Sequence, residues 1–141
     1  MSFFRPRSFD FIGIGDSVLD TFLTIEEASV ACQLKQDVCQ LCLAYGEKVP
    51  LKSVKNIYGA GNSSNTSIGA SRLGLKTAIV SIVGDDATGR QIQHQWQAEK
   101  VSTQFVQIDH KRETNHHTVL SFKGERTILV YHEPRTYHLP K

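Results

Sequence analysis

The chain has 141 residues, 40% of them hydrophobic, which suits one domain or one lobe of a larger one and argues against wholesale disorder. Its net charge of +2, with both signs interspersed, gives no case for nucleic acid as the main partner. No apolar run reaches the roughly 18 residues that span a bilayer, and the N-terminus lacks the apolar core of a secretion signal.

The first expected strand is the short apolar run 9–15 (FDFIGIG), followed by the sequence GDSVLD, which contains Asp16 and Asp20. Ligands dock at the carboxyl ends of strands in open α/β sheets, so these carboxylates are candidates to accept hydrogen bonds from a sugar or polyol. The alternative is that they cap a turn or stay solvated. A dinucleotide fingerprint is excluded because Val18 occupies the third glycine position and residues 21–25 read as a strand.

Three cysteines, Cys32, Cys39 and Cys42, lie in the segment that follows this second strand. An odd number cannot all pair within one chain, which favours a reducing, cytoplasmic setting. The C-x2-C spacing hints at a metal site, but no nearby histidine supplies a fourth ligand. We therefore interpret the cysteines as small apolar residues in an insertion, with a metal or redox role as the weaker alternative.

The stretch from Gly59 to Gly89 organises the chain: a glycine loop opens a helix, and a strand and a second glycine turn follow. Asn62, Ser63 and Ser64 are candidate N-caps, and Gly74 is expected to end the helix. The amide of Asn65, in the first turn, can both donate hydrogen bonds to a hydroxyl-rich ligand and accept them, although it could also be a cap.

Residues 76–83 are expected to form a strand buried on both faces, 84–89 a turn, and the residues after it a helix running to about Lys100 with Ile92 and Trp96 in its buried stripe. In the turn between them, aspartates such as Asp86 are expected to cap that helix. Residues 49–58 and 105–108 also read as strands, and 117–131 as a hairpin with Gly124 in its turn.

With these motifs in view, the chain resembles the N-terminal portion of the ribokinase-like (PfkB-type) carbohydrate kinases. The resemblance rests on five ordered matches, which are specific together although each alone is weak. They are GDSVLD, Ala60-Gly61-Asn62-Ser63-Ser64-Asn65, Arg72-Leu73-Gly74, Val83-Gly84-Asp85-Asp86-Ala87-Thr88-Gly89 and Gly124-Glu125-Arg126-Thr127.

The resemblance implies an α/β fold, the N-terminal part of a ribokinase-like (Rossmann-like) sandwich with a β-strand lid. Residues 1–141 would be the N-terminal part of a carbohydrate kinase domain, with lid strands at about 20–25 and 117–131 and an insertion at about 26–48. Substrate-binding roles fall on Asp20, Gly61 and Asn65, and supporting roles on Asp16, Ala60 and Asp86. Ala60 departs from the family's first glycine, although Gly59 precedes it.

The resemblance also implies ATP-dependent phosphoryl transfer to a hydroxyl of a sugar or nucleoside, with ATP and Mg²⁺ as cofactors of the full-length enzyme. The family's catalytic G-A-G-D motif does not occur in this chain, so we expect no catalytic residue, no bound cofactor and no metal site here, and an inactive isolated chain. A homodimer through the lid strands is expected. The alternatives are a non-enzymatic sugar-binding or dimerisation module, and a metal- or redox-dependent module built on Cys32, Cys39 and Cys42.

Overall fold

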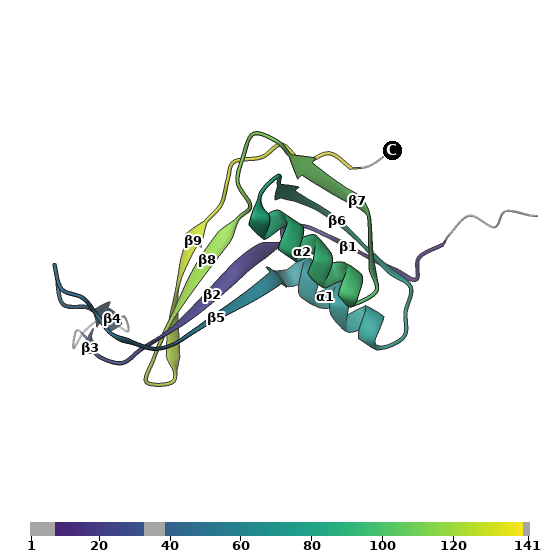
Figure 1. Cartoon of the computed structure of the whole chain (residues 1–141). Helices are drawn as coiled ribbons and strands as arrows, with labels where there is room; N and C mark the ends of the chain where they lie inside the picture. The colour runs from purple at the N-terminus through teal and green to yellow at the C-terminus, as the bar shows by residue number, and fades with distance from the viewer. Residues whose placement is uncertain (1–7, 33–38, 140–141) are drawn as a thin grey trace, which may run out of the picture. The chain divides into compact units, whose positions relative to one another are not determined.

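A computed structural model describes residues 8–32 and 39–139, and the chain divides into two compact units. The first comprises Met1–Leu19, Tyr58–His116 and Tyr131–Lys141, and the second comprises Asp20–Ile57 and His117–Val130. Figure 1 traces the elements along the chain.

The first unit is built on a parallel sheet of three strands in the order β1 (Phe11–Ile14), β6 (Thr77–Gly84) and β7 (Val101–Asp109). The helix α1 (Asn62–Arg72) packs against β1 and β6, and α2 (Ala87–Ala98) packs against β6 and β7. The chain adds the strands β1, β6 and β7 in one direction across the sheet, with α1 before β6 and α2 before β7. Right-handed crossovers in one direction place both helices on the same face of the sheet (Figure 1). The predicted α/β class is confirmed.

The core of this unit lies between β6 and α2. Ile92 and Trp96 of α2 have no solvent exposure and pack with Ile79 and Val83 of β6, also fully buried. The eight residues of β6 are all buried, as its apolar, β-branched sequence predicts. The helical stripe predicted from the spacing of Ile92 and Trp96 is therefore confirmed.

Only the C-terminal end of α1 agrees with the prediction. Gly74 follows the helix with φ 92°, and its N–H donates to the carbonyl of Ser71 at 2.9 Å. At the start, however, Gly61 is the N-cap and no side chain caps the helix. The prediction of a cap from Asn62, Ser63 or Ser64 is wrong, because both serine hydroxyls donate instead to backbone carbonyls that precede the helix.

The second unit contains a sheet of four strands in the order β5 (Leu51–Ala60), β2 (Val18–Ile25), β8 (His116–Phe122) and β9 (Glu125–Tyr131). The strands predicted at 20–25, 49–58 and 117–131 are all present, with small differences in their ends. A two-residue turn, Lys123 and Gly124 with φ of 51° and 85°, joins β8 to β9. Positive φ at both positions is the hairpin turn that matches the twist of the strands.

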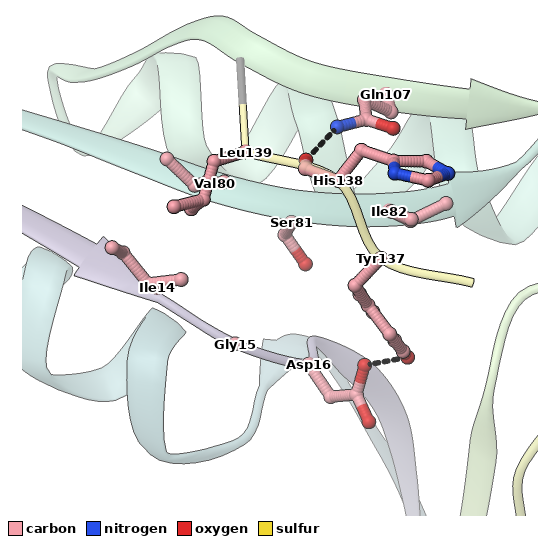
Figure 2. Close-up of a pocket in the computed structure, with 10 residues that line it drawn as sticks. All are labelled: Ile14, Gly15, Asp16, Val80, Ser81, Ile82, Gln107, Tyr137, His138 and Leu139. Atoms are coloured by element: carbon pink, nitrogen blue, oxygen red, sulfur yellow. Dashed lines mark hydrogen bonds between the residues drawn. The ribbon is translucent and has the colours of Figure 1, made fainter. Parts of the chain in front are cut away.

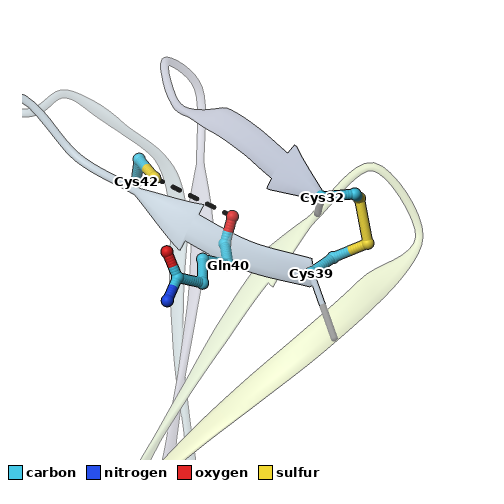
Figure 3. The surroundings of a disulfide bond; sticks show 4 residues. All are labelled: Cys32, Cys39, Gln40 and Cys42. Carbon is cyan, nitrogen blue, oxygen red and sulfur yellow. Dashed lines mark hydrogen bonds between the residues drawn. A yellow bond between two sulfur atoms is a disulfide. The ribbon is translucent and has the colours of Figure 1, made fainter. Parts of the chain in front are cut away.

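The cysteine segment forms a separate two-stranded antiparallel sheet, β3 (Ser29–Cys32) with β4 (Cys39–Cys42). Cys32 and Cys39 are exposed and joined by a disulfide, while Cys42 is a free thiol (Figure 3). The interpretation of these cysteines as small apolar residues is wrong for this pair, since both lie on the surface. Disulfide sulfurs are not thiolates, so the three-thiol metal site is not formed either.

Candidate functional site

The loop before α1 is shaped by two glycines with positive φ, Gly59 at 70° and Gly61 at 100°. A Cβ on Gly61 would lie 2.9 Å from the backbone oxygen of Asp16, closer than side chains approach, so this position requires glycine. Ala60 between them is 4% exposed and has no positive φ. The departure from the family's glycine pair is thus explained, because the left-handed backbone sits at Gly59 and leaves Ala60 in an ordinary conformation.

Hydrogen bonds from buried side chains hold this loop in place. The hydroxyl of Ser64 donates to the carbonyl of Gly59, and the indole Nε1–H of Trp96 donates to the Ser64 oxygen at 2.7 Å. Trp96 belongs to α2, so one chain of hydrogen bonds joins the packed helix to the loop. The loop is therefore held in one conformation by groups that are themselves buried.

Asn65 lies in the first turn of α1, where its side chain is exposed and its backbone N–H donates to the Gly61 carbonyl at 2.9 Å. With no side-chain cap, the positive end of the helix adjoins this amide. The structure therefore brings together Gly61, Asn65 and, through the close approach at Gly61, the backbone of Asp16. The arrangement offers hydrogen-bond donors and acceptors at the carboxyl ends of parallel strands, where α/β proteins bind ligands.

Asp16 lies at the end of β1 beside a cavity of about 300 Å³ (Figure 2). Its backbone oxygen accepts a hydrogen bond from Ser63 at 2.7 Å, and its carboxylate accepts one from the phenol of Tyr137. Burial and this hydrogen bond raise the pKa of Tyr137 to about 12, so the phenol keeps its proton at neutral pH. His132 Nδ1 lies 3.8 Å from the same carboxylate. The side chain and backbone of Asp16 are thus both held by neighbouring residues.

Asp20 belongs to the second unit, on β2 of the four-stranded sheet. Its Oδ1 lies 3.2 Å from Nδ1 of His117 on the neighbouring strand β8, and both side chains are about one-fifth exposed, at 21% and 20%. The carboxylate is thus partly accessible, with an imidazole beside it. His117 lies in the segment predicted as a hairpin, and no local pattern in the sequence relates it to Asp20.

Asp86 caps α2 and ties the acidic turn to a distant loop. One carboxylate oxygen accepts from the N–H of Gly89 at 2.6 Å and from the hydroxyl of Thr114 at 2.8 Å, and the other accepts from the N–H of Thr114 at 2.7 Å. Burial acts to raise the pKa of Asp86, but the hydrogen bonds from Gly89 and Thr114 and the charge of Arg90 outweigh it and hold the pKa below its usual value. The predicted helix cap is confirmed.

The glycines on either side of Asp86 are required by the same packing. A Cβ on Gly84 would lie 2.7 Å from the N–H nitrogen of Thr114, and one on Gly89 would lie 2.2 Å from the carbonyl oxygen of Gly84. The Thr114 hydroxyl also accepts from the N–H of Gly84 at 2.9 Å. The spacing of glycine, aspartate and glycine in this turn therefore has a structural cause, independent of any ligand.

Sequence reasoning missed a second buried network in this unit. Asn115 is 1% exposed, and its side-chain oxygen accepts from Arg135 Nη1 at 2.7 Å and from the N–H of Glu133 at 3.0 Å. Arg135 has 1% side-chain exposure and also reaches Asp109 at 3.2 Å. The sequence alone assigns no element and no role to residues 111–115 or 132–141. No local spacing relates residues 20 positions apart, so nothing in the sequence signals this network.

The residues that the structure describes do not fit the cofactors implied by the resemblance. Within residues 8–32 and 39–139, no three His, Cys, Asp or Glu side chains gather where they could hold a metal ion. The sequence has no G-x-x-x-x-G-K-[ST] phosphate loop. In the same described part of the chain, no helix has the length and apolarity needed to cross a membrane.

A glycine loop after β5 and an exposed amide at the start of the following helix adjoin a parallel sheet with helices on one face, the arrangement of an α/β protein that binds ligands at strand ends. The family model described as "pfkB family carbohydrate kinase" matches residues 22–141. The chain belongs to this family of carbohydrate kinases.

Individual relatives agree with this assignment. A 5-dehydro-2-deoxygluconokinase of Bacillus thuringiensis (strain Al Hakam) is 39% identical over 62 residues, which cover 43% of this chain and 19% of that protein. A fructokinase of Salmonella typhimurium is 32% identical over 75 residues, which cover 52% of this chain and 24% of that protein. The chain thus corresponds to about a quarter or less of the length of these curated relatives.

Solved structures show the same fold. The fructokinase of Halothermothrix orenii superposes with a TM-score of 0.64 at 24% identity, covering 86% of this chain and 37% of that structure. The ribokinase of Arabidopsis thaliana, complexed with ribose and ATP, superposes with a TM-score of 0.65 at 20% identity, covering 85% of this chain and 35% of that structure. The predicted ribokinase-like fold is confirmed.

Proposed function

We propose that this chain is the substrate-binding and lid half of an ATP-dependent sugar or nucleoside kinase, with Asp20, Gly61 and Asn65 as its substrate contacts. The observation that carries the proposal is the start of α1. Gly61 approaches the Asp16 backbone closely, no side chain caps the helix, and the amide of Asn65 is exposed beside it. Ser63 and Ser64 are turned away to other partners, which leaves the helix start open to a hydroxyl-bearing ligand.

The proposed class of substrate is supported by the names of the relatives. The curated matches are named for phosphorylating 5-dehydro-2-deoxygluconate and fructose, and one structural relative was captured with ribose. All three substrates are small molecules rich in hydroxyls. The carboxylate of Asp20 and the amide of Asn65 suit such molecules, because one accepts hydrogen bonds and the other both accepts and donates them.

Phosphoryl transfer itself is proposed to need residues outside this chain. The support is the absence of a G-A-G-D motif from the sequence and of a metal-holding cluster from the described residues. We expect the isolated chain to form no ADP when incubated with ATP, Mg²⁺ and each sugar in turn. Sugar-dependent ADP formation that survives purification to homogeneity would overturn this part of the proposal.

The four-stranded sheet is proposed to form a homodimer through its edge strand β9. β9 lies at one edge of the four-stranded sheet, and its residues Ile128, Leu129 and Val130 are 45%, 54% and 62% exposed. An exposed apolar edge strand invites pairing with another chain. We expect Val130→Lys to convert a dimer to a monomer in sedimentation velocity. Val54→Lys is the matched control, since Val54 lies on the opposite edge strand and is 61% exposed.

The binding proposal is tested by thermal shift with fructose, ribose and 5-dehydro-2-deoxygluconate at millimolar concentrations. We expect at least one of them to raise the melting temperature of the wild-type chain, and Asp20→Asn and Asn65→Ala to abolish that rise. Asp85→Asn and Gln91→Ala are matched controls, since both side chains are exposed and lie in the other glycine turn and helix. Equal responses in the site variants and the controls would contradict the assignment of the contacts.

A further inference from the structure

The β3–β4 hairpin has little buried surface to hold it together. All four residues of β3 are exposed, and in β4 only Leu41 and Cys42 are partly buried. A two-stranded sheet is marginally stable at best when it lacks a packed face. Backbone pairing and the cross-link between Cys32 and Cys39 are therefore the main constraints on this hairpin.

The disulfide is placed to act as that constraint. Cys32 and Cys39 lie directly opposite one another in the register of the two strands, and both are exposed to solvent. Cys42 pairs with Ser29 and stands three residues beyond Cys39, so its side chain points to the other face of the strand. Its Sγ donates to the carbonyl of Gln40 at 3.9 Å (Figure 3). The three sulfurs therefore do not converge on one point.

The hairpin faces part of the four-stranded sheet across a cavity within the same unit. A cavity of about 300 Å³ is lined on one side by Val30, Cys39 and Leu41, and on the other by residues of β8 and β9 that include Leu120 and Phe122. Displacement of the hairpin would remove the wall of this cavity. The apolar side chains of β8 would then lose their cover.

We propose that the Cys32–Cys39 disulfide is a thiol–disulfide exchange site whose reduction by a dithiol releases the β3–β4 hairpin and uncovers the apolar residues of β8. A thiolate of the dithiol attacks one sulfur, the Cys32–Cys39 bond breaks, and a mixed disulfide forms. The second thiolate of the dithiol then displaces the protein sulfur. The dithiol leaves oxidised as a disulfide, and Cys32 and Cys39 are left as two thiols.

The size of the effect follows from the short loop that the disulfide closes. With a sequence separation of 7, loss of the cross-link lowers the equilibrium constant for hairpin closure roughly 50-fold in the chain-entropy model. Because the hairpin has so little buried surface, it should open when the cross-link is lost. The parallel sheet keeps its own core between β6 and α2, so the change should not reach it.

The test is hydrogen exchange measured by mass spectrometry on the full chain, oxidised and after reduction with dithiothreitol. We expect the amides of β3 and β4 to exchange on the order of 50-fold faster after reduction, with β6 and β7 unchanged. A hydrophobic dye should fluoresce more strongly with the reduced chain, as β8 is uncovered. The double variant Cys32→Ser/Cys39→Ser should behave as reduced without any reductant, and Cys42→Ser should behave as wild type.

Three results would overturn the proposal. One is three titratable thiols in the chain oxidised in air, because the disulfide would then not form. Another is an exchange rate in β3 and β4 that changes by less than about two-fold on reduction, far below the loop-closure expectation. The last is stoichiometric zinc in the reduced chain together with a protected hairpin, which would make the cysteines a metal site instead.

Discussion

Replacing Asp86 by asparagine tests whether the acidic turn is structural. Asparagine keeps the shape and still caps a helix well, so its Oδ1 can serve Gly89 and the Thr114 hydroxyl. Its amide NH₂ group then faces the N–H of Thr114, whose nitrogen lies 2.7 Å from a carboxylate oxygen of Asp86 in the wild type. One charge-assisted hydrogen bond is lost and a buried donor is left without an acceptor. We expect the free energy of unfolding to fall by about 2–3 kcal/mol.

The assay is urea unfolding followed by the fluorescence of Trp96, the one tryptophan of the chain, which is buried against the sheet that Asp86 serves. At this chain length the expected loss lowers the melting temperature by very roughly 5–12 °C. Asp85→Asn is the control, since this neighbouring carboxylate is exposed and its loss should cost less than about 0.5 kcal/mol. Equal effects of the two substitutions would refute the structural role of Asp86.

The difference in unfolding free energy between wild type and Asp86→Asn should depend on pH. The pKa of Asp86 is lowered in the folded state, because the hydrogen bonds and the charge of Arg90 outweigh burial. Its contribution is therefore complete above the unfolded pKa of about 4 and is lost as the pH falls through the folded value. The gap in unfolding free energy between wild type and Asp86→Asn should be constant near neutral pH and narrow below about pH 4. A gap that widens on acidification would contradict this sign.

Three further predictions concern the supports of the site. Gly61→Ala should destabilise the chain by about 2–3 kcal/mol more than Gly46→Ala in thermal unfolding, because both glycines have positive φ but only Gly61 meets a neighbouring backbone. Trp96→Phe should cost about 1–3 kcal/mol in urea unfolding monitored by circular dichroism, since the Ser64 hydroxyl loses its donor. Arg135→Met should lower the melting temperature more than Arg112→Met, because the side chain of Arg135 is 1% exposed and that of Arg112 is 44% exposed. Equal effects within the glycine pair or within the arginine pair would contradict the stated reason.

Patterns of short range were enough to predict most of the first unit. The β-branched run of β6 and the spacing of Ile92 and Trp96 depend only on residues near one another, and periodicity reports such contacts directly. The glycine and aspartate positions of the acidic turn were also visible as a motif. Their cause was not, because Thr114, the partner of Asp86, is 28 residues away.

The failures share one physical origin. The serines at the start of α1 were predicted to cap it by propensity, but the backbone carbonyls of Asp16 and Gly59 compete for their hydroxyls in the folded chain. The network of Arg135 and the pairing of Cys32 with Cys39 likewise depend on where the fold carries segments that have no local pattern. Propensity describes a residue's neighbours in sequence, and these contacts are made with neighbours in space.

Contact of Gly61, Asn65 and Asp20 with a sugar can be measured by titrating the ¹⁵N-labelled chain with fructose, ribose and 5-dehydro-2-deoxygluconate and following its amide resonances by NMR. We expect one of these sugars to shift the resonances of Gly61, Asn65 and Asp20 with a single saturable binding curve. We expect Asn65→Ala to weaken binding at least about 10-fold, as loss of roughly 1.4 kcal/mol of hydrogen bonding requires. Unmoved resonances at all three positions up to high sugar concentration, or an Asn65→Ala variant that binds as tightly as wild type, would contradict it.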